Sequence, residues 1–159
     1  AQNRIRGLFM IVYRIARKEH IRDLSGTGAR ITGGRWNPKG LAMLYTASSS
    51  SLAILEALVH VDRDLMPTDL CIAEIEIGDG HSMEKISIDD LSTDWKNYPS
   101  PDSLKDMGRQ WLLSGRSLVL QVPSAINPLE VNFLVNPLHG EMGKVKVGKV
   151  HPLTLDNRL

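Results

Sequence analysis

T-G-G-R-W-N-P-K-G-L-A-M-L-Y-T-A-S-S-S-S-L-A-I-L-E-A-L-V-H, residues 32–60, contains a loop, a strand pattern and a helix pattern in succession. The glycine pair leads into Arg35, a short apolar run ends at Tyr45, and Glu56 lies in the helical pattern. These side chains provide a fixed cation, an aromatic ring and a carboxylate. Such a set suits a ligand with phosphates, a flat ring and a carbon that becomes positively charged.

The sequence on both sides of this stretch predicts one α+β domain over residues 10–159, with many short strands and two or three helices. β-Branched and alternating runs predict the strands, apolar periodicity predicts the helices, and the glycines and proline of 25–40 predict a loop. The predicted strands are 10–16, 41–46, 70–77, 84–88, 117–122, 131–135 and 144–150, and the predicted helices are 52–61, 103–113 and a short one at 17–24. Lysines alternate with valines in the last strand, as expected at a sheet edge.

Composition restricts the class of protein. The chain has 159 residues, 42% hydrophobic and 23% charged, which is typical of one globular domain. A formal net charge of +1 argues against a general nucleic-acid binder. The single cysteine, Cys71, excludes an internal disulfide framework and favours the cytoplasm. No apolar run is long enough for a membrane span. Met10 could be a natural start, so 1–9 is set aside as an added or disordered segment.

Glu56 lies on an unusual helix face for a carboxylate. Residues three and four positions away share that face, and they are Leu52, Ala53, Val59 and His60. A carboxylate among apolar neighbours is expected either to pair with another polar group or to have a functional role. One interpretation is a contact with His60 one turn later. The other is a carboxylate that steadies an oxocarbenium-like sugar during cleavage of a glycosidic bond.

Each of the other candidates has a structural and a functional interpretation. Arg35 is either a surface residue or a phosphate ligand, because its planar fork matches phosphate oxygens. Trp36 either packs the loop or forms a wall of a binding site. Tyr45 belongs to the core, or it stacks on a heterocycle or gives a hydroxyl hydrogen bond. Ser124 either caps a turn or binds a phosphate or ribose oxygen, and Asn132 is expected near a turn on local grounds alone.

Several known motifs are missing from the sequence. The glycines of 25–40 form neither a dinucleotide fingerprint nor a phosphate-binding P-loop. No serine lies in a nucleophile elbow. His60-x-Asp62-x-Asp64 has the spacing of metal ligands but leaves a predicted helix end, where such groups are usually solvated. We therefore expect no metal site.

Taken together, five segments resemble the RES domain, in the family's order and from about Tyr13 to the C-terminus. They are G-G-R-W-N-P-K-G at 33–40, L-Y-T-A at 44–47, A-x-x-E at 53–56, V-P-S-A at 122–125 and N-F-L-V-N-P-L-H at 132–139. The family is named for an arginine, a glutamate and a serine. It supplies the toxin of bacterial RES–Xre toxin–antitoxin pairs.

This resemblance implies an ADP-ribosyltransferase-like fold, with a split, curved β core, flanking helices and a cleft for NAD. It implies a toxin that depletes NAD by hydrolysis or phosphorolysis and so arrests growth. Some members instead transfer ADP-ribose to a protein. NAD would be a substrate, inorganic phosphate could be a co-substrate, and no cofactor is expected. A non-catalytic module that binds a nucleotide or a protein is the alternative from a different class.

The resemblance also implies roles for particular residues. Arg35, Tyr45 and Glu56 would be catalytic, and Arg35 and Tyr45 would bind substrate together with Trp36, Ser124 and Asn132. The expected partner is an Xre-type helix-turn-helix antitoxin, through which alone the chain would meet nucleic acid. A membrane partner is not expected, and a homodimer is left open.

Overall fold

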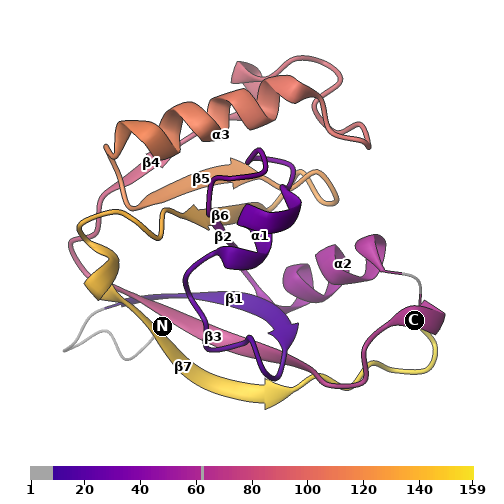
Figure 1. The fold of residues 1–159 in the computed structure, drawn as a ribbon. Coiled ribbons are helices and arrows are strands. Elements are labelled where there is room, and N and C mark those ends of the chain that lie inside the picture. Colours follow the sequence, from indigo (N-terminus) through magenta and orange to yellow (C-terminus); the bar gives the residue numbers. More distant parts are fainter. Residues whose placement is uncertain (1–8, 62) are drawn as a thin grey trace.

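The computed structural model describes residues 9–61 and 63–159, and its main feature is one mixed β-sheet (Figure 1). The strands are β1 Phe9–Arg17, β2 Leu44–Ala47, β3 Leu70–Gly78, β4 Met83–Lys85, β5 Val119–Pro123, β6 Val131–Val135 and β7 Val145–Pro152. The helices are α1 Thr27–Thr32, α2 Ser50–His60 and α3 Asp102–Ser114, with the 3-10 turns η1 Arg63–Leu65, η2 Ile88–Asp90 and η3 Met142–Lys144. No helix in this described part of the chain is long and apolar enough to cross a membrane.

The sheet consists of two halves that meet at one narrow junction. Its strand order is β4-β5-β6-β2-β1-β3-β7, and every neighbouring pair is antiparallel except β4 and β5. Strand β1 pairs with β3 along its whole length, but it meets β2 at the single register pair Tyr13 and Ala47. The sheet is thus split between β2 and β1. The prediction of an α+β fold with a split, curved β core is confirmed.

Strand β3 shows why the apolar pattern specifies this sheet. Cys71, Ala73, Ile75 and Ile77 are buried, and the residues between them, including the two glutamates, are only partly covered. This is the predicted half-buried strand. Strand β7 lies at the sheet edge, as its alternating lysines indicated.

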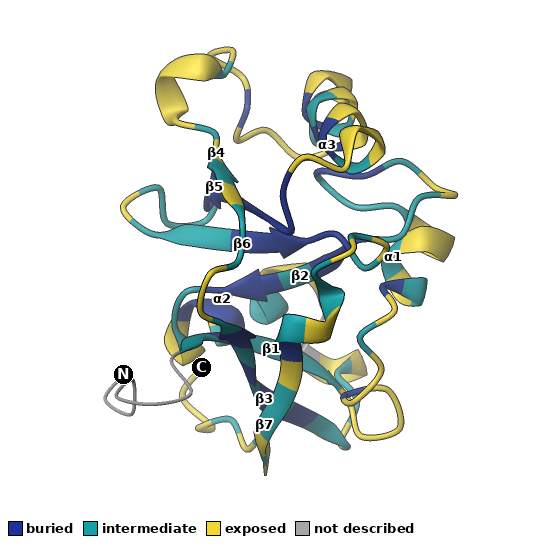
Figure 2. Ribbon diagram, turned by 90° about the vertical axis from the view of Figure 1, so that its left-hand side faces the viewer, coloured by how far each residue is buried: buried dark blue, intermediate teal, exposed yellow. Residues whose placement is uncertain are grey.

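The helices cover different halves of the sheet. Helix α2 is capped by Ser49, whose hydroxyl accepts the Leu52 N–H at 3.1 Å, and it buries Leu52 and Ala53 in a cluster with β1 residues. Helix α3 packs against the β2–β6–β5 half, where buried residues gather (Figure 2). A Cβ atom at Gly108 would lie 1.7 Å from the Trp36 carbonyl oxygen. Only glycine therefore lets α3 touch the loop that carries Arg35.

Two local predictions are wrong. Residues 25–40, predicted as a loop, contain α1, which buries none of its residues and so has no apolar stripe to detect. Residues 17–24, predicted as a short helix, instead contain the end of β1 at Arg17 and turns at 18–22. The expectation for residues 1–9 mostly lies outside the described residues, but Phe9 belongs to β1, where it pairs with Gly78.

Candidate functional site

A cavity of about 650 Å³ opens between the two halves of the sheet, the loop after α1 and the start of α3. Arg35, Trp36, Tyr45, Glu56 and Asn132 all line it. They come from the loop, β2, α2 and β6, and are brought together by the pairing of β2 with β6 and by the packing of α2 on β1. Five of the six residues selected from the sequence therefore share one cavity.

The Glu56 carboxylate is held through one of its two oxygens. Oε2 accepts a hydrogen bond from Asn132 Nδ2 at 2.7 Å and another from Ser124 Oγ at 2.9 Å. No described residue donates a hydrogen bond to Oε1. Because the carboxylate is fixed by two donors on one side, the other oxygen is oriented and still available for a ligand. The interpretation of Glu56 as a partner of His60 is not what the hydrogen bonds show.

Ser124, the sixth selected residue, does not contact the cavity. It is completely buried, and its Oγ accepts the backbone N–H groups of Ile126 and Asn127, both at 3.1 Å. Those two donors fill the lone pairs of the hydroxyl oxygen, so its proton points to Glu56. The sequence left two interpretations of Ser124 open, a turn cap or a contact with ligand. Its bonds from Ile126 and Asn127 are those of a turn cap, and its remaining bond positions Glu56.

Tyr45 presents its ring to the cavity and its hydroxyl to the glycine-rich loop. The hydroxyl donates to Asn37 Oδ1 at 2.6 Å and accepts the Trp36 N–H at 3.0 Å. Burial raises the pKa of this hydroxyl well above its ordinary value. A Cβ atom at Gly34 would lie 2.6 Å from the Tyr45 oxygen, so this approach requires glycine. The Tyr45 hydroxyl therefore holds the loop, and only the ring is free for a ligand.

Asn37 is a further residue of the site that the sequence did not single out. It is completely buried, and its Nδ2 donates to the carbonyl oxygens of Ala29 and Leu41, both at 2.9 Å, and of Pro38 at 3.2 Å. With Tyr45 on its Oδ1, this one side chain ties α1, the loop and β2 together. Its position before a proline, in N-P-K-G, was the available signal.

Arg35 uses part of its guanidinium to hold a distant loop. Nη1 donates to the carbonyl oxygen of Trp95 at 2.8 Å, and Nη2 donates to that of Asn97 at 3.2 Å. Burial lowers the pKa of Arg35, and the negative charge of nearby Glu56 opposes this shift. A guanidinium carries five N–H donors, so Arg35 can hold this loop and still donate to a ligand.

The charges along the cavity favour an anion. Arg14, Arg35 and Lys105 line it, against the one carboxylate of Glu56. Arg14 reaches the cavity from β1. Its Nη1 donates to the carbonyl oxygens of His20 and Ile21 at 3.0 and 2.8 Å, and burial lowers its pKa. These cations would suit a pyrophosphate or a free phosphate.

Trp36 fits both of the interpretations that the sequence offered for it. A metal site gains no support from the described residues. Trp36 is buried in the cluster under α3, so it packs the loop, and it is also one of the residues that line the cavity. Within residues 9–61 and 63–159, no group of histidine, cysteine and acidic side chains could hold a metal ion. Asp62 of the His60–Asp64 spacing lies outside the described residues.

The split sheet, its flanking helices and this cavity define a protein with an ADP-ribosyltransferase-like fold. Among solved structures, the chain is similar to a chain in the crystal structure of the M. tuberculosis MbcT–MbcA toxin–antitoxin complex. The TM-score is 0.76 and the identity 20%, over 93% of this chain and 86% of the other. At that identity the likeness concerns the fold.

Sequence comparison specifies the family. The family model described as the RES domain matches residues 11–156. A protein of Sphingobium sp. (strain YBL2) named Prs ADP-ribosylating toxin is 40% identical over 146 residues, 91% of each chain. A protein of Yersinia enterocolitica named Toxin Res is 40% identical over 146 residues, which cover 91% of this chain and 95% of the other. The chain belongs to the RES domain family, as its motifs indicated.

Proposed function

We propose that this chain is the toxin of a bacterial toxin–antitoxin pair, and that it acts by breaking the bond between nicotinamide and ribose in NAD. The toxin assignment is supported by relatives named Toxin Res that match more than nine tenths of the chain. The observation that carries the chemistry is the Glu56 carboxylate, held through Oε2 by Ser124 and Asn132 at a cavity shared with Arg35 and Tyr45.

The reaction needs little from the protein besides charge and position. Nicotinamide in NAD is already a cation, so it leaves with the bonding electron pair and becomes neutral without an acid. Positive charge then grows on the ribose carbon, and the Glu56 carboxylate stabilises that charge or accepts a hydrogen bond from a ribose hydroxyl. The acceptor oxygen gives an electron pair to that carbon and releases its proton. Arg35, with Arg14 and Lys105, would hold the pyrophosphate, while the Tyr45 ring lies beside the nicotinamide.

The acceptor defines two versions of this function. Water or inorganic phosphate as acceptor would deplete NAD, and the cationic cavity lining is suited to a phosphate co-substrate. A protein as acceptor would make the chain an ADP-ribosyltransferase, and the 40% identical relative named Prs ADP-ribosylating toxin favours that version. A binding module without catalysis would bind NAD and leave it intact.

The proposed partner is an Xre-type helix-turn-helix antitoxin. The likeness of the fold to a chain from a toxin–antitoxin complex supports a cognate antitoxin. Expression of the chain alone would then arrest bacterial growth, and expression with the protein encoded next to it would restore growth.

The experiment follows NAD labelled in its ADP-ribose part, with phosphate, without phosphate and with cytosolic protein added. Free ADP-ribose identifies hydrolysis, ADP-ribose-1″-phosphate identifies phosphorolysis, and a labelled macromolecule identifies transfer. The same reactions with Glu56→Gln, which keeps the shape of the side chain, separate this chain's activity from a contaminant. If no nicotinamide is released under any of these conditions, the proposed chemistry is wrong.

A further inference from the structure

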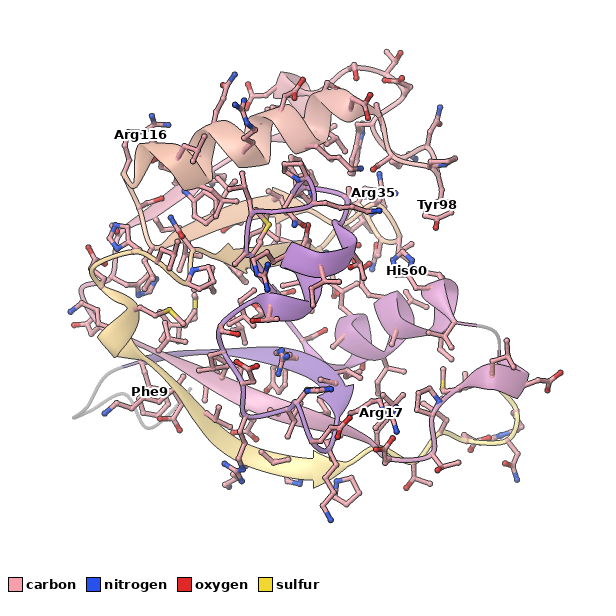
Figure 3. The ribbon with its side chains drawn as sticks, viewed as in Figure 1. Phe9, Arg17, Arg35, His60, Tyr98 and Arg116 are labelled. Carbon is pink, nitrogen blue, oxygen red and sulfur yellow. The ribbon has the colours of Figure 1, made fainter. Side chains whose placement is uncertain are left out.

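Two of the rings that line the cavity lie next to each other. His60 ends α2, four residues after Glu56, which places it about 6 Å farther along the helix axis. Tyr98 lies in the segment 92–101 before α3, and the centroids of the two rings are 6.1 Å apart with planes tilted by 53°. Both residues line the cavity. Figure 3 shows them with Arg35 at one opening between α2 and that segment.

The segment that carries Tyr98 is anchored on both sides of it. The Trp95 ring is buried in the cluster under α3, and Arg35 holds the carbonyl oxygens of Trp95 and Asn97. On the other side, Lys105 Nζ donates to Ser100 Oγ at 3.0 Å. Tyr98 itself is 80% exposed. Because this segment is anchored on both sides, the exposed Tyr98 ring is held at the cavity, where a ligand could contact it.

We infer that Tyr98 and His60 form a stacking site for a flat heterocyclic ring of the dinucleotide. This inference rests on the proposed function. A ring sandwiched between two parallel rings needs about 7 Å between them, because aromatic faces stack about 3.5 Å apart. The pair here is closer than that and tilted. The ligand ring therefore stacks on the open face of Tyr98, and His60 supports the Tyr98 ring from the other side.

This arrangement also gives Arg35 a second task. Its bonds to Trp95 and Asn97 fix the position of Tyr98 at the cavity, while its remaining donors are available to the ligand. A planar fork can hold two carbonyl oxygens at once, but a lysine ammonium offers no such geometry. Arg35→Lys therefore keeps the charge of the site and loosens the stacking residue.

The test compares Tyr98→Ala and Tyr98→Phe with the unsubstituted protein, using NAD and nicotinamide mononucleotide as substrates. Loss of a stacked base weakens binding about tenfold or more. We expect KM for NAD to rise by that factor in Tyr98→Ala with kcat nearly unchanged, and Tyr98→Phe to retain the original KM. His60→Ala should raise KM less. Leu138→Ala removes a similarly exposed side chain that does not line the cavity, and should change nothing.

The mononucleotide identifies which ring is bound, because it lacks adenine. If its KM is unchanged in Tyr98→Ala while that of NAD rises, the stacked ring is adenine. If both rise, it is nicotinamide. If KM for NAD is the same in Tyr98→Ala and the unsubstituted protein, there is no stacking site, although the proposed function stands.

A binding measurement separates the two proposals when there is no turnover. If the protein does not cleave NAD, the proposed function fails, and calorimetry with NAD still tests the stacking site. Weaker binding by Tyr98→Ala than by Tyr98→Phe supports the site. Equal binding by both variants, or no binding of NAD to the unsubstituted protein, overturns it.

Discussion

The Ser124 hydroxyl donates a hydrogen bond to the Glu56 carboxylate at 2.9 Å, joining residues 68 positions apart in sequence. Two backbone N–H groups fill the lone pairs of the serine oxygen, so its proton has one direction available. The bond connects the chain just after β5 to the cavity-facing side of α2. In the proposed function, Ser124 would therefore affect the ligand only through Glu56, whose carboxylate it helps to orient.

Ser124→Ala should lower both activity and stability. A hydrogen bond to a charged group contributes about 1.5–3 kcal/mol, so kcat/KM should fall about ten- to hundredfold. The N–H groups of Ile126 and Asn127 lose their acceptor, so the free energy of unfolding should fall by about 1–3 kcal/mol. Nicotinamide release and denaturant unfolding measure the two effects.

Ser117→Ala is the matched control for that substitution. Ser117 is also buried, donates to the Val119 carbonyl oxygen at 3.0 Å and accepts Trp111 Nε1 at 2.8 Å, but it is not near Glu56. Its loss should reduce stability to a similar extent and leave kcat/KM unchanged. If Ser124→Ala behaves like Ser117→Ala, Glu56 does not depend on Ser124.

Asn132→Asp should change how the activity depends on pH. The substitution places a second carboxylate against Glu56 Oε2, where an amide now donates at 2.7 Å. Two carboxylates at that distance repel each other, so the introduced pair would bind a shared proton up to a higher pH than a single carboxylate does. The acidic limb of the kcat/KM profile should therefore move to higher pH. Asn132→Leu, without the new charge, should move it less. If the acidic limbs of the kcat/KM profiles coincide for Asn132→Asp and the unsubstituted protein, an ionised Glu56 is not required.

Two glycine substitutions should have opposite effects. A Cβ atom at Gly34 would meet Tyr45 Oη at 2.6 Å and Asn37 Oδ1 at 2.9 Å, so Gly34→Ala overpacks the loop and should cost about 1–3 kcal/mol of stability. At Gly28, in α1, the added methyl meets nothing within 4 Å, and alanine should stabilise the helix by about 0.5–1 kcal/mol. Gly34→Ala should also lose activity, because the loop carries Arg35. Unfolding curves and nicotinamide release check both, and equal stability of the two variants would contradict this account of the loop.

Tyr45 should keep its proton until the protein unfolds in alkali. Its pKa is raised in the folded state, so its contribution to stability is complete below the ordinary tyrosine pKa of about 10 and is lost as the pH rises further. In a titration followed by ultraviolet absorbance, one tyrosinate should appear together with unfolding. Tyr45→Phe should remove that part of the signal. A Tyr45 signal that appears while the protein is still folded would show that the hydroxyl is not held as described.

Much of the sheet could be predicted because its pattern is local. The alternation in 70–77, the lysines of 144–150 and the serines before α2 each act within a few residues of the element they specify. Helix α1 could not be predicted in this way. It has six residues, none of them buried, and it depends on the hydrogen bond from Asn37 to its Ala29 carbonyl oxygen.

The sequence could indicate which residues line the cavity, but not which hydrogen bonds hold them in place. Arg35, Tyr45 and Glu56 were recognisable from residue type and spacing together. The partners of these residues could not be read from the sequence, because Arg35 reaches carbonyl groups 60 and 62 positions away and Glu56 reaches Ser124 and Asn132 at 68 and 76. Backbone carbonyl partners leave no side-chain signature. Tertiary contacts decide which of the candidate polar groups touch the ligand and which hold another residue in place.

The central claim is that the Glu56 carboxylate stabilises the ribose as nicotinamide leaves. Its most direct test is the single-turnover rate of nicotinamide release from saturating NAD, for the unsubstituted protein and for Glu56→Gln. The amide keeps the volume but not the charge, so the rate should fall at least a hundredfold while the affinity for NAD changes little. Equal rates for the two proteins would contradict the account.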